Sequence, residues 1–276
     1  MSRRIDSHQH FWKYDPVRDS WITDEMHTIQ KDFLPIDLWP ELIQSNIDGC
    51  VAVQADSSMT ETYFLLNQAK QHPWILGVVG WIDLCSELLT QHLEYLADRP
   101  ALVGFRHILQ AEPGGFMLQS SFVNGLQSLR LHGYTYDLLI TEHQLPEAYE
   151  LLLKVPEAKV VIDHIAKPDI RKQSYDQWAL WMTKMSELEN VHVKISGMIT
   201  EADWQQWHSL DFTKYFDLCM ELFGADRLMF GSDWPVCLVA GKYGEVVQLV
   251  ENAIRDFSAE EQKAIMGETA SKFYHL

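Results

Sequence analysis

Two histidines stand two residues apart near the front of the chain, in the run Asp6-Ser7-His8-Gln9-His10-Phe11-Trp12. We expect a short strand over residues 4–11, and side chains alternate between the two faces of a strand. His8 and His10 should therefore point the same way, with Asp6 on the same face. Two imidazoles side by side can hold a cation or donate together to one oxygen. A polar strand end with solvated histidines is the competing interpretation, because short motifs have many false positives.

Five later apolar runs also end in ionisable or hydroxyl side chains. The pairs at these ends are Arg106 and His107, Tyr136 and Asp137, Asp163 and His164, Lys194 and Ser196, and Ser232 and Asp233. A buried charge costs several kcal/mol unless it is paired, hydrogen-bonded or bound to metal. Structural packing alone is therefore a poor explanation for five apolar runs that each end in polar side chains. If the runs end at one place, their side chains can satisfy one another around a ligand.

The elements that must position these residues alternate along the whole chain. Apolar runs rich in Val, Ile and aromatic residues predict strands at about 4–11, 49–55, 75–82, 102–109, 134–140, 159–165, 191–196 and 227–231. Amphipathic runs between them predict helices at about 36–46, 59–71, 86–97, 120–131, 144–154, 175–188, 211–223 and 244–256. Strict alternation favours a parallel sheet with right-handed crossovers.

Eight such repeats in about 250 residues predict an α/β fold, a single-domain (β/α)8 TIM barrel over residues 1–276, regular or distorted. An open doubly wound sheet is the alternative, but the glycine-rich phosphate turn expected after its first strand is missing from the sequence. In a barrel the carboxyl ends of the strands meet at one mouth, where catalytic groups lie. The long irregular stretch 12–35 is rich in aromatic residues, so we expect a wall or lid over that mouth, or an apron packed on the barrel.

Composition restricts the partners. The 276 residues carry a net charge of −17, which disfavours nucleic acid and anionic membranes as partners. The sequence contains neither a run of 18 apolar residues nor a secretory signal, so we expect a cytoplasmic protein without a membrane span. Four scattered cysteines argue against a disulfide framework or a cysteine zinc site. The sequence leaves open whether the chain forms an oligomer.

Three motifs together resemble those of the amidohydrolase superfamily. They are the Asp-x-His-x-His-Phe-Trp run at 6–12, Asp163-His164 after an apolar strand, and Gly-Ser-Asp-Trp-Pro at 231–235. Within this superfamily the chain resembles the branch of lactone hydrolases that includes sugar lactonases and 2-pyrone-4,6-dicarboxylate lactonase. The segments 104–113 and 163–168 support that placement, and the resemblance extends from Ile5 to Tyr274.

The resemblance implies roles for the paired residues. Asp233 is similar to the general base that takes a proton from the attacking water, with His164 as its catalytic partner. His8, His10, His164 and Asp233 match positions that bind one divalent cation, zinc being favoured, whereas in metal-free members the histidines polarise the carbonyl instead. Arg106-His107 stands where a bridging lysine would be, and the fifth strand ends in Tyr-Asp rather than His. We therefore expect one metal ion or none.

Further residues are candidates for substrate binding. Arg106 has the planar fork that suits a carboxylate or hydroxyls, and a salt bridge holding its strand is the alternative role. His107 has the opposite parity, so one of these two should face away from the barrel interior. Asp163 should likewise face away from His164 and be structural. The weaker candidates are Lys167, Ser196 and Trp12, the last as a platform for an apolar sugar face.

The favoured function is hydrolysis of a sugar-acid lactone, of an L-fuconolactone or L-rhamnonolactone type. A pyrone dicarboxylate would need several cationic contacts, and Arg106 is the one cation that the pattern places in the site. A metal-dependent decarboxylase of a related branch and a non-catalytic sugar-acid binding barrel are the alternatives.

Overall fold

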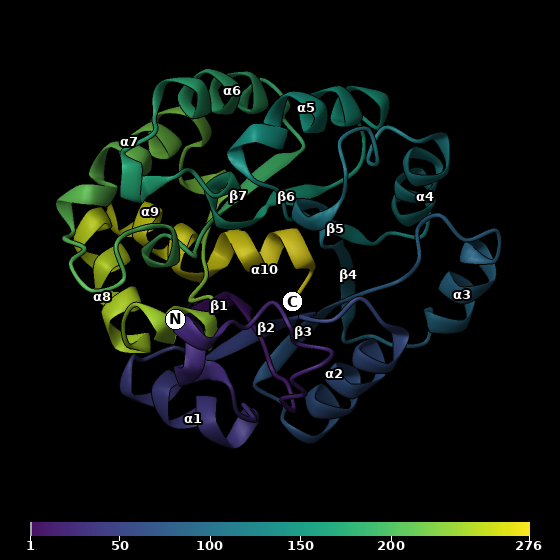
Figure 1. Ribbon diagram of the computed structural model, residues 1–276, viewed down its shortest axis with the longest axis horizontal. Coiled ribbons are helices and arrows are strands. Elements are labelled where there is room, and N and C mark those ends of the chain that lie inside the picture. The colour runs from purple at the N-terminus through teal and green to yellow at the C-terminus, as the bar shows by residue number, and fades with distance from the viewer. Residues whose placement is uncertain (1) are drawn as a thin grey trace.

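The computed structural model describes residues 2–276, in which eight parallel strands follow one another in sequence order around one sheet (Figure 1). The bounds are β1 (Ile5–Gln9), β2 (Gly49–Val53), β3 (Ile75–Gly80), β4 (Leu102–His107), β5 (Thr135–Leu138), β6 (Val160–Ile162), β7 (Val191–Ile195) and β8 (Leu228–Phe230). Backbone bonds from His10 N to Trp234 O (2.7 Å) and from Asp233 N to His8 O (2.8 Å) join the two ends of the sheet. The predicted (β/α)8 barrel is confirmed, and each predicted run contains one strand.

Helices surround the ring of strands. Their bounds are α1 (Pro35–Gln44), α2 (Met59–Gln71), α3 (Leu89–Leu96), α4 (Ser120–Leu131), α5 (Leu145–Lys154), α6 (Asp176–Ser186), α7 (Leu210–Phe223), α8 (Tyr243–Ile254), α9 (Ala259–Lys263) and α10 (Thr269–Tyr274). The first eight match the predicted runs. The short helices α9 and α10 escaped prediction because five or six residues are too few to show a helical period.

Helix α10 lies across the ring of strands in Figure 1. Its Phe273 and Tyr274 pack against a small apolar cluster contributed by the strands, which includes Ile5, Val51 and Met229. Ile5 is the first residue of β1, whereas His8 and His10 lie at the other end of that strand. The C-terminal helix therefore closes one end of the barrel and leaves the other end for the polar side chains.

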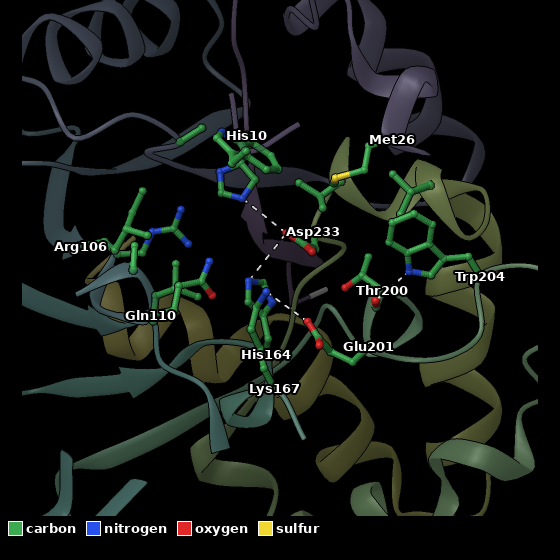
Figure 2. Close-up of a pocket in the computed structure, with 17 residues that line it drawn as sticks. His10, Met26, Arg106, Gln110, His164, Lys167, Thr200, Glu201, Trp204 and Asp233 are labelled. Atoms are coloured by element: carbon green, nitrogen blue, oxygen red, sulfur yellow. Dashed lines mark hydrogen bonds and ion pairs between the residues drawn. The ribbon is translucent and has the colours of Figure 1, made fainter. Parts of the chain in front are cut away.

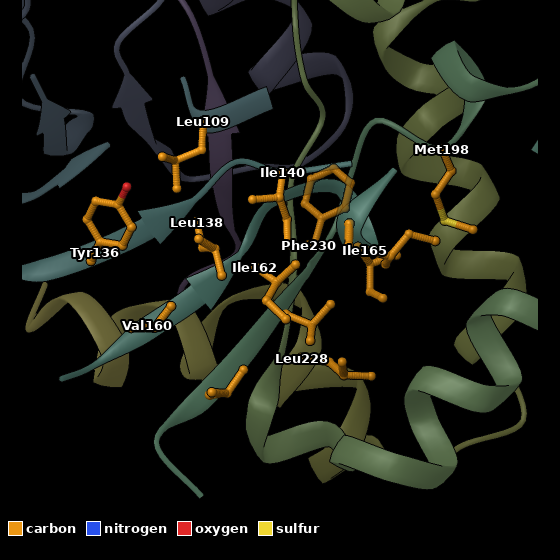
Figure 3. Close-up of a cluster of buried hydrophobic side chains, with 14 of the residues drawn as sticks. Leu109, Tyr136, Leu138, Ile140, Val160, Ile162, Ile165, Met198, Leu228 and Phe230 are labelled. Carbon is orange, nitrogen blue, oxygen red and sulfur yellow. The ribbon is translucent and has the colours of Figure 1, made fainter. Parts of the chain in front are cut away.

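The larger apolar core lies between the strands and the outer helices. Figure 3 shows part of it, where Leu138 of β5, Ile162 of β6 and Phe230 of β8 lie among buried side chains. Strands buried on both faces read as continuous apolar runs, which is why periodicity located them. In residues 2–276 no helix is long and apolar enough to cross a membrane.

The segment between β1 and α1 forms part of the wall of a cavity at the open end. Trp12 and Phe33 pair through two backbone bonds of 2.9 Å, and a 3-10 helix (Asp24–Ile29) lies between them. Trp21 and Met26 from this segment line the cavity. The predicted long loop over the barrel mouth is thus present, and it carries a short helix.

Candidate active site

The two histidines of the opening motif meet at the end of β1. Their Nε2 atoms lie 3.2 Å apart, so the prediction that they point the same way is confirmed. His10 Nδ1 lies 2.8 Å from the carbonyl oxygen of Val53. Because a carbonyl only accepts, His10 carries a proton on Nδ1, and in the neutral ring Nε2 presents a lone pair.

Asp6 does not join them, and the prediction that it shares their face is wrong. The register of β1 against β2 shifts between Asp6 and Gln9, which breaks the alternation of side chains. The Asp6 carboxylate accepts bonds from Ser232 N (2.9 Å), Ser232 Oγ (2.6 Å) and the Tyr243 hydroxyl (3.1 Å). Burial raises its pKa to about 6, against these hydrogen bonds. Asp6 therefore anchors the segment that follows β8.

That segment delivers Asp233, whose backbone has a φ of 58°. Its Oδ1 lies 3.4 Å from His10 Nε2 and 3.8 Å from His164 Nε2 (Figure 2). The Nε2 atom of His8 also lies 3.8 Å from this oxygen. Burial opposes ionisation of this carboxyl, but His164 and the other two imidazoles outweigh burial and hold its pKa below the ordinary value. Asp233 is therefore an ionised carboxylate at neutral pH.

His164 reaches the site through an uncommon backbone turn. Four consecutive residues from His164 to Lys167 have φ between 48° and 60°. Left-handed geometry costs L-residues about 1–2 kcal/mol each, so the surrounding contacts must hold the turn. One of these is the bond from Trp178 Nε1 to Ile165 O, at 2.7 Å.

The prediction that Asp163 faces away from His164 is wrong, because both side chains contact groups of the site. The strand β6 ends at Ile162, so strand alternation no longer applies to Asp163 and His164, and both point inward. Gly197 makes room for the second of them. It has a φ of 61°, and a Cβ there would lie 2.5 Å from His164 Nδ1.

The three imidazoles of the site are buried and neutral at pH 7. Burial lowers the pKa of His164 to about 4, in spite of the nearby Asp233 and Asp163. Burial also lowers the pKa of His8 and of His10. The hydroxyl of Ser196 lies 2.9 Å from His164 Nδ1 and can serve that nitrogen as donor or acceptor. Ser196 thus lies behind His164 rather than among the residues that line the cavity.

Beneath these rings lies a group of buried ion pairs, which we call the ion-pair layer: Arg106, Asp137, Asp163 and Lys194. Lys194 Nζ contacts Asp137 Oδ2 and lies 3.1 Å from Asp163 Oδ1, and Arg106 Nη1 lies 3.0 Å from Asp163 Oδ2. The Tyr274 hydroxyl of α10 donates to Asp137 at 2.9 Å. Two carboxylates and two cations balance, which is what permits such burial.

The cavity above has a volume of about 390 Å³. His10, Arg106, His164 and Asp233 line it, and the predicted candidate Lys167 does so while paired with Glu201 at 3.1 Å. Sequence reasoning missed several lining residues that come from loops without a periodic pattern: Trp21, Met26, Gln110, Thr200, Glu201 and Trp204. Their shared signal is position, since each lies on a loop that follows a strand or on the segment 12–35.

Two predicted substrate-binding residues lie away from this cavity. His107 points outward, as its parity relative to Arg106 allows, and its Nε2 lies 2.8 Å from Glu112 Oε1. Trp12 is buried against Trp21 and Phe33 and donates from Nε1 to Lys31 O at 2.9 Å. The structure therefore brings Arg106 and Lys167 to the cavity, and gives His107 and Trp12 packing partners elsewhere.

The donor atoms fit a single cation. His8, His10 and Asp233 place one ligand atom each within 4.8 Å of one another, and so do His8, Asp163 and His164. Two ligands at the usual zinc distance in tetrahedral geometry lie roughly 3.3–3.4 Å apart. The separations of 3.2 Å between His8 and His10 and 3.4 Å between His10 and Asp233 are close to that value. The lone pair of His10 Nε2 also requires a hydrogen-bond donor or a cation as its partner.

The same groups can do hydrolytic chemistry. An ionised carboxylate beside neutral imidazoles can accept a proton from water. Imidazole N–H groups and a guanidinium can stabilise negative charge that develops on an oxygen. The arrangement is therefore suited to attack of water on a carbonyl.

Comparisons with known proteins agree with this arrangement. The family model described as Amidohydrolase matches residues 5–276. The chain is 37% identical to L-fucono-1,5-lactonase of Burkholderia multivorans, over 99% of this chain and 96% of that protein. It is 32% identical to L-fucono-1,5-lactonase of Burkholderia ambifaria, over 100% of this chain and 97% of that protein. A crystal structure of an amidohydrolase from Burkholderia multivorans with bound zinc superposes with a TM-score of 0.97 at 36% identity, over the whole of both chains.

Proposed function

The chain belongs to the amidohydrolase family, and from that premise we propose that it hydrolyses a sugar-acid lactone of the L-fuconolactone type by Asp233-assisted attack of water. Relatives that carry the name L-fucono-1,5-lactonase at 37% and 32% identity support a lactone-hydrolysing enzyme. The predicted family and enzyme class are confirmed. The particular lactone and the mechanism are our proposal.

One observation supports the mechanism above the others. Asp233 is buried and ionised, faces three neutral imidazoles, and lines the cavity with its Oδ1 within 3.4–3.8 Å of their Nε2 atoms. The side chains that contact the Asp233 carboxylate are these neutral imidazoles, and none of them is a lysine or an arginine. Its charge is therefore available to accept a proton from a water molecule in the cavity.

The remaining residues divide the other tasks of ring opening. Asp233 takes the proton of the attacking water and can return it to the leaving alkoxide. His10 and His164 line the floor of the cavity, where they orient the water and the carbonyl. Arg106 adds positive charge beside the oxygen that becomes anionic. A divalent cation held by His8, His10 and Asp233 would supply Lewis acidity toward the carbonyl.

The walls of the cavity suit a small polyhydroxylated ring. Gln110, Thr200 and the Lys167–Glu201 pair offer donors and acceptors for hydroxyl groups. Trp204 donates from Nε1 to Thr200 O at 2.9 Å, which fixes its ring at the cavity wall. Amphipathic aromatic rings of this kind pack well on the apolar faces of sugars.

The test is a panel of aldonolactones with the purified protein, with acid release followed in weak buffer and with chelator present or absent. We expect release above the spontaneous rate for L-fuconolactone and closely related lactones. A rate equal to the spontaneous one across the whole panel would refute the proposal. Release of CO2 from a hydroxybenzoate under the same conditions would favour the decarboxylase alternative.

A further inference from the structure

Four neighbouring groups lie within hydrogen-bond distance of the two ring nitrogens of His8, and they favour different positions for its proton. Nδ1 lies 3.2 Å from Asp163 Oδ1, an acceptor, and 3.1 Å from Lys194 Nζ, a donor. Nε2 lies 3.2 Å from His10 Nε2 and 3.3 Å from Arg106 Nη1, a donor. A neutral imidazole has one N–H and one lone pair, so these contacts cannot all be hydrogen bonds at once.

The position of the proton on His10 indicates which tautomer His8 adopts. Its proton is fixed on Nδ1 by Val53 O, so its Nε2 is an acceptor, and that nitrogen lies 3.4 Å from Asp233 Oδ1, a second acceptor. With the proton of His8 on Nδ1, three acceptors would face one another in a buried site, which native proteins avoid. With the proton on Nε2, His8 donates to His10 and its own Nδ1 accepts from Lys194. The same ammonium lies 3.1 Å from Asp163 Oδ1, so it serves both of the acceptors that then face each other, His8 Nδ1 and Asp163 Oδ1.

Of the two cations near His8, Lys194 favours the tautomer with the proton on Nε2, whereas Arg106 has another acceptor. Arg106 Nη1 has Asp163 Oδ2 as a nearer partner, at 3.0 Å, so it does not depend on His8 as an acceptor. Lys194 is fully buried and is held by Asp137 and Asp163, which fixes its ammonium beside His8 Nδ1. An ammonium has three protons, which matches its three neighbours Asp137, Asp163 and His8.

We infer that Lys194 is a positioning residue that holds His8, in the metal-free protein, in the tautomer with its proton on Nε2. His8 can present a lone pair at Nε2 to a divalent cation only after that proton has left to solvent and another has bound at Nδ1, where Asp163 accepts it. The ring is neutral before and after, so the exchange changes the tautomer and not the charge. Lys194 thus weakens cation binding at this site. The inference goes beyond lactone hydrolysis and does not depend on turnover.

The direct test uses the full chain labelled with ¹⁵N-histidine and dialysed against chelator. Two-bond ¹H–¹⁵N correlation spectra distinguish the tautomers, and the His8→Gln variant assigns the signal. We expect Nε2–H for His8 and Nδ1–H for His10 without metal, and Nδ1–H for both after zinc is added. Nδ1–H for His8 in the metal-free protein would overturn the inference, whether or not the protein hydrolyses lactones.

The second test measures zinc affinity by competition with a chromophoric chelator. The double variant Lys194→Met with Asp137→Asn keeps the charges of the ion-pair layer balanced and removes the donor to His8. Changes of residues that support metal ligands typically alter affinity about 10–100-fold, and here we expect binding at least tenfold tighter. The exposed Lys172→Met is the matched control and should change nothing. Affinity equal to or weaker than that of the unsubstituted protein would refute the role of Lys194, and if the double variant does not fold, the spectra of the unsubstituted chain decide.

Discussion

The barrel holds two groups of buried polar side chains that differ in how their charge is balanced. The donor set, defined as His8, His10, His164 and Asp233, has one carboxylate and three neutral rings, and three of its members line the cavity. The ion-pair layer has two carboxylates matched by two cations, and its Asp137, Asp163 and Lys194 are fully buried. Balanced charge can stay buried as long as no partner is removed, whereas unbalanced charge at a cavity remains available for chemistry.

Adjacent residues belong to the two groups. Asp163 enters the ion-pair layer and His164 enters the donor set, although one follows the other in sequence. The left-handed turn that begins at His164 keeps both side chains inside the barrel, since a regular strand would send them to opposite faces. Substitutions in each group should therefore separate activity from stability.

The largest effect is expected for Asp233→Asn, which should lower kcat for lactone hydrolysis about 10²–10⁴-fold, the usual contribution of a general base. Its melting temperature should change little, because the cost of burying the carboxylate is offset in the unsubstituted protein by its contacts with the three imidazoles. Acid release and thermal unfolding measure the two quantities. The exposed Asp217→Asn is the control. A variant that keeps most of its activity would remove Asp233 from the role of base.

The opposite pattern is expected for Lys194→Met. Breaking a buried ion pair typically costs about 3–5 kcal/mol, and this substitution leaves Asp137 buried without its cation. Urea unfolding at pH 7 should show this loss. Adding Asp137→Asn should recover more than half of it, since the double variant leaves Arg106 to balance Asp163. If the single variant is as stable as the unsubstituted protein, the ion-pair layer does not have the structural role we assign to it.

Acid should weaken the donor set through His164. Its pKa in the folded state is about 4, below its ordinary 6.5, so the unfolded chain binds more protons between these values. The contribution of His164 to stability is therefore complete above pH 6.5 and is lost as the pH falls toward 4. At about 1.4 kcal/mol per pKa unit, the loss between pH 7 and 4.5 is about 2–3 kcal/mol.

The measurement is a difference between two proteins. Asp6 and Asp137 have pKa values raised to about 6 by burial, so they change stability in the opposite direction over the same range. The pH dependence of unfolding in chelator should therefore be compared between the unsubstituted protein and His164→Gln. Identical slopes for the two would show that His164 is not buried as a neutral ring.

The next expected effect concerns Gly197→Ala, which tests the space that His164 occupies. The new Cβ would lie 2.5 Å from His164 Nδ1, and the φ of 61° is unfavourable for alanine. We expect a loss of about 1–3 kcal/mol together with reduced kcat. Gly133→Ala separates the two causes, because Gly133 has a φ of 80° with open space around it, so it should cost stability only. Equal effects of both substitutions on kcat would mean that His164 tolerates displacement.

Sequence patterns located most of the fold because parallel strands buried on both sides are continuous apolar runs. They also located the donor set, since polar residues at strand ends are visible in the sequence. They failed where the backbone departs from the ideal strand. The irregularity in β1 turned Asp6 away, and the left-handed turn brought His164 to the same side as Asp163. The cavity walls, such as Trp204, lie on loops whose course depends on tertiary contacts and not on a local period.

The smallest expected effect belongs to Ala166, in the middle of the left-handed turn. Its φ is 60° and its side chain is fully buried. Glycine would remove a conformational cost of about 1–2 kcal/mol. It would also lose about 0.8 kcal/mol of methyl burial and about 0.5–1 kcal/mol of chain entropy. These contributions nearly cancel, so Ala166→Gly should change the free energy of unfolding by less than about 0.5 kcal/mol. Ala202 is also buried but has an ordinary φ of −96°, so glycine there relieves no strain. Ala202→Gly should therefore cost about 1–2 kcal/mol, from lost methyl burial and chain entropy alone. Equal losses at both positions, measured by urea unfolding, would show that the turn from His164 to Lys167 holds no strain.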